Sequence, residues 1–80
     1  MDKKLYNKVK MGNGDSNIRF NDLYNLALDL GFNFQGWSGS HVGFYNPTIC
    51  ESLNLQKTKD GKAKPYQAKQ LRQIINMYNL

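Results

Sequence analysis

The side chain best suited to acid–base chemistry in this chain is its single histidine, His41. Histidine has an unperturbed pKa of about 6.5, so an imidazole can accept and donate protons near neutral pH. Gly39 and Ser40 precede it and favour a turn, and residues 41–45 then alternate in the manner of a strand. Because strand side chains alternate between two faces, Tyr45 is expected beside His41 on the open face. The spacing predicts an accessible histidine in a strand, supported by the turn at Gly39.

Basic side chains are concentrated at both ends of the sequence, and those of the C-terminal part could contact a polyanion. The formal net charge is +5, and residues 57–80 carry six basic side chains against one acidic side chain. Lysines gain affinity for nucleic-acid phosphates by releasing counterions. The alternative is a solvated loop that keeps the chain soluble. The side chains expected to contact RNA are Lys57, Lys59, Lys62, Lys64 and Lys69.

Cleavage of RNA without a metal ion is a reaction that such a histidine and lysines could share. It requires a base that activates the 2′-hydroxyl, an acid that protonates the leaving 5′-oxygen, and charge stabilisation at the phosphate. His41 can act as the base or the acid, and a second group must take the other role. The possible helpers are Ser40, Tyr45, a lysine of residues 57–64 and water. Trp37 and Tyr45 could stack on bases, or serve only in packing.

The sequence offers fewer of the residues that a metal site or a cysteine nucleophile would need. A zinc site typically takes about four Cys, His or carboxylate ligands, and the chain has one Cys and one His. A two-metal nuclease needs clustered carboxylates, whereas the acidic residues here are scattered. A nucleophilic pair of Cys50 and His41 remains open, beside the simpler interpretation of Cys50 as a small buried filler. We expect neither a metal nor another cofactor.

Length and composition indicate one soluble domain spanning residues 1–80. The hydrophobic share is 40% and the aromatic share 12%, which is typical of a folded chain. A single cysteine fits a reducing, cytoplasmic environment. No segment resembles a leader peptide or approaches the roughly 20 apolar residues of a membrane span. We therefore expect a cytoplasmic protein with no membrane contact.

Three segments have the apolar spacing of amphipathic helices. The first precedes a turn at Gly12–Asp15. The second is predicted to be capped by Asn21 and to stop at Gly31, and the third starts at Pro65 and runs for roughly 13 residues. The apolar positions that define them are Leu5, Tyr6 and Val9; Leu23, Leu26, Ala27 and Leu30; and Ala68, Leu71, Ile75 and Tyr78.

Three short strands are predicted after the second helix, because apolar and other side chains alternate in each. Gly36 and Ser38-Gly39 are expected to turn the chain after the first strand, and Asn46-Pro47 after the second. Residues 57–62 are expected to form an exposed loop. The order of elements predicts a two-layer α+β domain, in which two helices cover one face of an antiparallel sheet. The apolar strand positions are Phe32 and Phe34, Val42 and Phe44, and Leu53 and Leu55.

Several short motifs occur together in a characteristic order. They are Gly39-Ser40-His41, the aromatic Phe44, Pro47, Leu53-Asn54-Leu55-Gln56, Gly61-Lys62-Ala63-Lys64-Pro65-Tyr66-Gln67 and Gln70-Leu71. Over residues 18–80 this pattern resembles the HicA toxin family, small ribonucleases of toxin–antitoxin systems. Two positions depart from it, since Val42 and Asn46 stand where many members have a histidine.

The resemblance implies an α-β-β-β-α fold similar to double-stranded-RNA-binding domains (dsRBDs) over residues 18–80, with residues 1–17 as an additional N-terminal helix and loop. It also implies an mRNA interferase, an endoribonuclease of stress responses, with His41 as its catalytic histidine and a HicB-type antitoxin as its protein partner. Two alternatives stay open. The chain could bind RNA through the same fold without cutting it, or be an interaction domain whose basic face binds an acidic protein.

Overall fold

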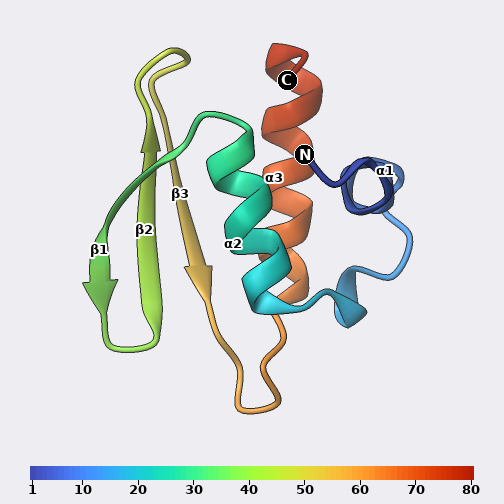
Figure 1. The fold of residues 1–80 in the computed structure, drawn as a ribbon, viewed down its shortest axis with the longest axis vertical. Coiled ribbons are helices and arrows are strands. Elements are labelled where there is room, and N and C mark those ends of the chain that lie inside the picture. The colour runs from blue at the N-terminus through green and yellow to red at the C-terminus, as the bar shows by residue number, and fades with distance from the viewer.

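The computed structural model describes residues 1–80 as helices and a three-stranded sheet in the predicted order (Figure 1). The strands form an antiparallel sheet with the order β1-β2-β3. The predicted α+β class is therefore confirmed. The elements are α1 (Lys3–Met11), the short 3-10 helix η1 (Asp15–Asn17), α2 (Phe20–Asp29), β1 (Asn33–Ser38), β2 (His41–Asn46), β3 (Glu51–Gln56) and α3 (Pro65–Tyr78), with residues 57–64 forming the β3–α3 connection.

The apolar side chains of the sheet face α2 and α3, which cover one side of it (Figure 1). Val42 and Phe44 alternate along β2 with side chains of the other face, and both are buried. The ring of Tyr24 in α2 meets that of Phe44 edge-on, with the centroids 5.0 Å apart. One cluster of 16 buried hydrophobic residues joins the helices to the sheet. The predicted alternation of β2 is confirmed, and His41 lies on the face that the helices leave open.

The start of α2 differs from the prediction, because Asn21 does not cap the helix. Arg19 holds the N-cap position and makes no side-chain capping bond. The N–H of Phe20 donates instead to the carbonyl of Gly61, at 3.0 Å. Since the β3–α3 connection satisfies this donor, the helix can begin without a side-chain cap. Burial of Phe20 in the core leaves Asn21 exposed in the first turn.

The other end of α2 is at Gly31, as predicted. Gly31 has a φ of 97°, and the N–H groups of Gly31 and Phe32 donate to carbonyls of the last turn at 3.1 and 3.0 Å. This is the Schellman arrangement, in which a glycine adopts the left-handed conformation that other residues avoid. The buried Asn46 of β2 donates from Nδ2 to the carbonyl of Leu30 at 3.2 Å. Asn46 therefore fixes the end of α2 against the sheet.

β1 is longer than predicted, and Gly36 lies within it instead of in a turn. The pairing register with β2 shifts between Phe34 and Gly36, which marks a bulge. The actual turn is the two-residue loop between the paired residues Ser38 and His41. Gly39 occupies its first position with a φ of 61°, as tight hairpin turns require.

The β3–α3 connection is an ordered turn and is only partly exposed, which differs from the predicted exposed loop. Lys57 and Ala63 form an antiparallel bridge across it, and Ala63 is buried. The hydroxyl of Thr58 hydrogen-bonds to Asp60 and accepts the N–H of Lys62 at 3.1 Å. These bonds close the turn, so its side chains are presented from a defined backbone.

α3 spans 14 residues from Pro65, in agreement with the prediction. The prediction that Tyr78 joins its buried stripe is wrong, because Tyr78 is exposed and its hydroxyl donates to Glu51 at 2.6 Å. The buried stripe instead includes the polar residue Gln67. Gln67 Oε1 accepts the N–H of Gln56 at 2.7 Å and so joins the first turn of α3 to the end of β3.

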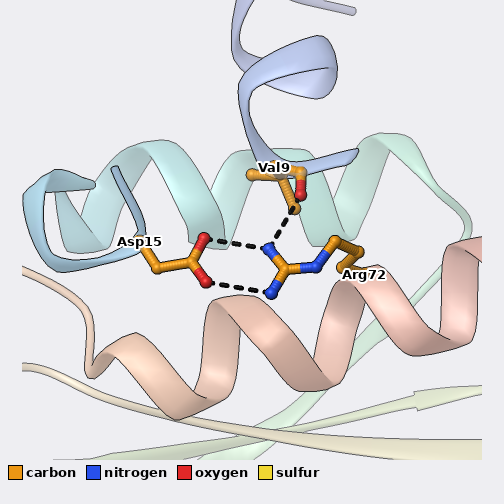
Figure 2. A network of polar contacts seen from close by, with 3 residues as sticks. All are labelled: Val9, Asp15 and Arg72. Carbon is orange, nitrogen blue, oxygen red and sulfur yellow. Dashed lines mark hydrogen bonds and ion pairs between the residues drawn. The ribbon is translucent and has the colours of Figure 1, made fainter. Parts of the chain in front are cut away.

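α1 packs outside the two layers and is held by Arg72 of α3 (Figure 2). Arg72 donates from Nη1 and Nη2 to the two carboxylate oxygens of Asp15, at 2.9 and 3.0 Å, and from Nη1 to the carbonyl of Val9 at 3.1 Å. The hydroxyl of Tyr6 donates to the carbonyl of Leu80 at 2.7 Å. These contacts tie residues 1–17 to the final helix. None of the helices combines the length and the apolar character that a bilayer crossing requires.

Candidate functional site

The predicted catalytic turn and most of the predicted RNA-binding lysines meet at one end of the molecule. In Figure 1 the β1–β2 turn, the β3–α3 connection and the first turns of α2 and α3 all lie at the lower end. The N–H of Lys57 donates to the carbonyl of Ser40 at 3.2 Å, and Arg19 forms an antiparallel bridge with Lys62. We call this region the basic end and define it as Arg19, residues 38–41 and residues 57–64.

His41 is the first residue of β2, the central strand of the sheet. Its register partners are Ser38 in β1 and Gln56 in β3. Since paired residues share a face, the imidazole projects from the open face between two uncharged side chains. His41 is half-buried, so its ring is flanked by neighbouring strands and still accessible to a ligand. This position fits a proton-transfer group at the edge of the basic end.

Of the predicted helpers Ser40 and Tyr45, the structure brings only Ser40 close to His41. Ser40 directly precedes it, and its Oγ accepts a hydrogen bond from Gln56 Nε2 at 3.3 Å. Tyr45 is four residues further along β2, which at 3.3 Å per residue is roughly 13 Å away. Hydrogen bonding with the Cys50 side chain, together with the negative charge of its thiolate form, raises the pKa of the Tyr45 phenol above its ordinary value. Tyr45 therefore belongs to a different part of the open face.

Cys50 lies far from His41, contrary to the open possibility of a nucleophilic pair. It is in the turn after β2, whereas His41 begins that strand. The thiol is exposed, so the interpretation of Cys50 as a buried filler is also wrong. Its φ of 55° is a left-handed conformation that suits the tight turn between β2 and β3.

The lysines of the basic end differ in exposure, and none is paired with a carboxylate. Lys57 and Lys59 are exposed, whereas Lys62 and Lys64 are half-buried. The structure contains a single ion pair, which lies elsewhere. Hydrogen bonding from the hydroxyl of Thr58 is the main cause that lowers the pKa of the only carboxyl group in the connection. Lys69 is exposed on α3 beyond this connection. Four lysines thus remain available to phosphate at the basic end.

The remainder of the open face is polar and uncharged. Its cross-strand pairs are Gly43 with Asn54 and Tyr45 with Ser52. A polyanion lying on this face would meet no carboxylate there and would find its cations at the end beside His41. The alternation of residues predicted this face, but the separation of its charge to one end depends on how the β3–α3 connection folds back.

A pocket that sequence reasoning missed lies between α2 and β1, and its lining residues Phe20 and Trp37 directly adjoin Arg19 and Ser38 of the basic end. Five residues line it: Phe20, Asn21, Tyr24, Asn25 and Trp37. The spacing of four residues between the two aromatic residues of α2, and between its two asparagines, is the signal that could have placed each pair on one helix face. Of the five, only Trp37 is a candidate for base stacking from the sequence alone.

The two positions that depart from the HicA pattern face away from the open side of the sheet. Val42 and Asn46 are both buried, with exposed fractions of 0% and 2%. A side chain at either position contacts the helices and not a ligand on the open face. No three His, Cys, Asp or Glu side chains gather in a way that would hold a metal ion. A comparison with protein-family models finds no match to this chain, and neither do comparisons with curated proteins and with solved structures.

Proposed function

We propose that this chain is a HicA-type endoribonuclease that cleaves mRNA without a metal ion, with His41 as the general acid or base. One observation carries the proposal. His41 stands on the open face of the sheet, and the N–H of Lys57 donates to the carbonyl of Ser40, the residue before His41, so the backbone of the unpaired lysines meets the histidine turn. The sequence α2-β1-β2-β3-α3, with both helices on one face, also suits a fold related to dsRBDs.

In the proposed reaction the basic end holds the phosphates and His41 moves the proton. Lysine is a compact, mobile charge, suited to a phosphate oxygen and to the charge that develops on it. As a neutral imidazole, His41 would take the proton of the 2′-hydroxyl as that oxygen attacks the adjacent phosphorus. A second group would protonate the leaving 5′-oxygen. Lys57, the cation beside the Ser40 turn, and water are the nearest choices, because the register partners of His41 are not acids.

The proposal includes a HicB-type antitoxin that silences the ribonuclease by covering the basic end in the cytoplasm. A basic surface favours an acidic partner and fast, salt-sensitive association. Occupying this region would block His41 and the lysines together. The same charge distribution that supports RNA binding therefore also indicates where the antitoxin would bind.

The proposal is tested by incubating a fluorophore–quencher RNA with the purified chain and with His41→Ala, in the presence of EDTA. We expect the original protein to cleave the RNA and His41→Ala to lose at least about 100-fold in rate, the usual contribution of general acid–base catalysis. The exposed Asn76→Ala on α3 is a matched control for one polar surface change. Equal rates for His41→Ala and the original protein would rule out His41 as the catalytic group.

One specific observation favours a second function: the residues paired with His41 across the sheet, Ser38 and Gln56, are not acidic. In that case the chain would bind RNA through the basic end without cutting it. The two functions separate in one experiment that measures cleavage and binding of the same RNA. Binding without cleavage, unchanged in affinity by His41→Ala, would support the binding module.

A further inference from the structure

The pocket between α2 and β1 is an open hollow of about 380 Å³ in which aromatic and amide side chains converge. Trp37 is 52% exposed, although its register partner Val42 is fully buried. The Trp37 ring leans on Phe20, with the ring centroids 5.7 Å apart and the planes inclined by 36°. Because Phe20 packs against the Trp37 indole and about half of this side chain stays exposed to solvent, a flat ring can stack on it.

Two carboxamide side chains that make no hydrogen bond within the protein line the same pocket as this indole. Asn21 and Asn25 are exposed and lie one turn apart on α2, so their side chains share a face. Neither caps the helix, which has no side-chain cap. Each carboxamide offers an acceptor oxygen and two N–H donors. A planar ligand with both donors and acceptors on its edge matches this set, which an aliphatic ligand would leave unsatisfied.

Cations lie next to the pocket, on the side of the basic end. Arg19 directly precedes the pocket residue Phe20, and its backbone is bridged to that of Lys62. A ligand in the pocket therefore has positive charge within reach of any anionic group attached to it. We infer that the pocket holds one nucleobase of a single-stranded RNA, stacked on Trp37 and hydrogen-bonded by Asn21 and Asn25, with Arg19 and Lys62 at its flanking phosphates.

This inference rests on the proposed function for the identity of the nucleic acid, and it adds a positioning role. Trp37 pairs with Val42, the residue after His41, but its side chain is on the opposite face of the sheet from the imidazole. An RNA with one base in the pocket must cross the β1–β2 turn to present a phosphodiester to His41. The turn residue Gly39 has open space around its Cα, since a side chain at this position would meet no atom of the remaining structure within 4 Å. The anchored base would fix which phosphodiester reaches His41.

The test uses the fluorescence of Trp37, the only tryptophan of the chain. The probe is a short single-stranded 2′-O-methyl RNA, which lacks the free 2′-hydroxyl and so cannot be cleaved through it. Its matched control is an abasic strand of the same length and charge. We expect the base-bearing strand to quench the fluorescence with saturation, and the abasic strand to bind more weakly and to leave the emission unchanged. Equal quenching by both strands would overturn the inference.

Variants then locate the effect, with binding measured by anisotropy of a labelled strand. Trp37→Ala should weaken binding of the base-bearing strand by about 5- to 150-fold, the range for loss of one base–aromatic stack, and leave binding of the abasic strand unchanged. Trp37→Phe should restore most of the loss. Phe34→Ala is the matched control, since Phe34 is on the same strand and 46% exposed but does not line the pocket. An equal loss in Phe34→Ala and Trp37→Ala would overturn the inference.

The outcome is independent of catalysis. Base-dependent binding that requires Trp37, in a protein that cleaves no RNA, would support the pocket and refute the ribonuclease. If the protein cleaves RNA but binds the base-bearing and abasic strands equally well, the nucleobase inference is refuted and the ribonuclease proposal is supported. If no oligonucleotide changes the Trp37 fluorescence or binds, the pocket does not hold a nucleobase, and the inference is overturned.

Discussion

Arg72 shows how a residue that counts only as positive charge in the sequence becomes a structural link. Its guanidinium side chain is 19% exposed and bonds both carboxylate oxygens of Asp15 and the carbonyl of Val9 (Figure 2). Hydrogen bonding to Asp15 is the main cause that raises the pKa of Arg72, so the guanidinium stays charged at any working pH. A lysine cannot reproduce this planar, bidentate contact with the carboxylate.

We expect Arg72→Lys to lower the free energy of unfolding by about 1–3 kcal/mol, because a partly buried carboxylate and a helix carbonyl lose charged hydrogen bonds. Urea unfolding followed by circular dichroism measures this. Lys69→Gln removes a charge from the same helix at an exposed position and should change stability by less than about 0.5 kcal/mol. A double-mutant cycle with Asp15→Asn should give a coupling of about 0.5–3 kcal/mol. No coupling would mean that the pair contributes nothing.

Gly39 carries a second prediction at the scale of one residue. Its φ of 61° is strained for an L-residue with a side chain, while a Cβ there would meet no atom within 4 Å. Gly39→Ala should therefore destabilise the protein by about 1–2 kcal/mol through the backbone alone. Ser40→Ala, the neighbouring position with no positive φ, is the control and should cost less than half as much in the same unfolding experiment. Equal costs would point to the hairpin in general and not to the backbone at Gly39.

Among the elements, the β3–α3 connection shows why exposed segments need the structure. The lysine run and Gly61 predicted an exposed loop, whereas Thr58 closes it through Asp60 and Lys62, and the distant Arg19 is bridged to Lys62. The hydrogen bond from Thr58 is the main cause that lowers the pKa of Asp60 below its ordinary value of 3.8. The charged form of Asp60 is thus part of the folded turn.

We expect this turn to respond to acid. Because the folded-state pKa of Asp60 is lowered, its carboxylate favours the folded turn above the ordinary pKa, and this contribution is lost as the pH falls through the folded-state pKa. Thr58→Val should raise the pKa of Asp60 toward its ordinary value, as an NMR titration of the carboxyl carbon would show. Thr58→Ser keeps the hydroxyl and should keep the lowered pKa. An unchanged titration in Thr58→Val would remove the assigned cause.

Secondary structure was predictable where the decisive contacts are local. The helix stop at Gly31 and the alternation at Val42 depend on neighbours in the sequence, and both are as predicted. The start of α2 was not predictable, because the partner of the Phe20 N–H is Gly61, 41 residues away. Likewise, residue types placed His41 on the open face, but only the folded β3–α3 connection brings the lysines beside it.

At the scale of the whole molecule, charge is segregated. The basic end carries Arg19 and four lysines, and α1 carries four further lysines, whereas Asp2, Asp22 and Asp29 line a pocket between α1 and α2. RNA binding should therefore depend on which lysines are removed and not only on how many. Net charge alone sets a uniform attraction, and local phosphate contacts set the salt dependence.

The prediction compares two triple variants of equal charge. Replacing Lys57, Lys59 and Lys64 by Gln should reduce the slope of log affinity against log salt concentration by about 0.7–0.9 for each phosphate that is no longer neutralised by a lysine. Replacing Lys3, Lys4 and Lys10 of α1 by Gln should leave that slope nearly unchanged. Filter binding of a single-stranded RNA over a range of salt concentrations measures both. Equal slopes for the two variants would mean that the lysine run only contributes net charge.

The proposed antitoxin should cover the basic end as a unit. In hydrogen exchange of the complex, we expect added protection in residues 39–45 and 57–69, where the histidine turn and the lysines lie together. The outward side of α1, which is remote from His41, provides the internal comparison. Protection confined to the helices would contradict occlusion of the ribonuclease site.

The bulge in β1 also bears on how these molecules behave in concentrated solution. β1 is an edge strand that exposes two aromatic side chains, Phe34 and Trp37, a combination that invites strands of other copies to pair and to grow into fibrils. The irregularity between Phe34 and Gly36 interrupts the row of outward backbone groups. A second copy therefore finds no continuous ladder to extend along β1. The bulge next to Gly36 therefore lets β1 expose two aromatic side chains at the edge of the sheet without favouring strand pairing between copies of the protein.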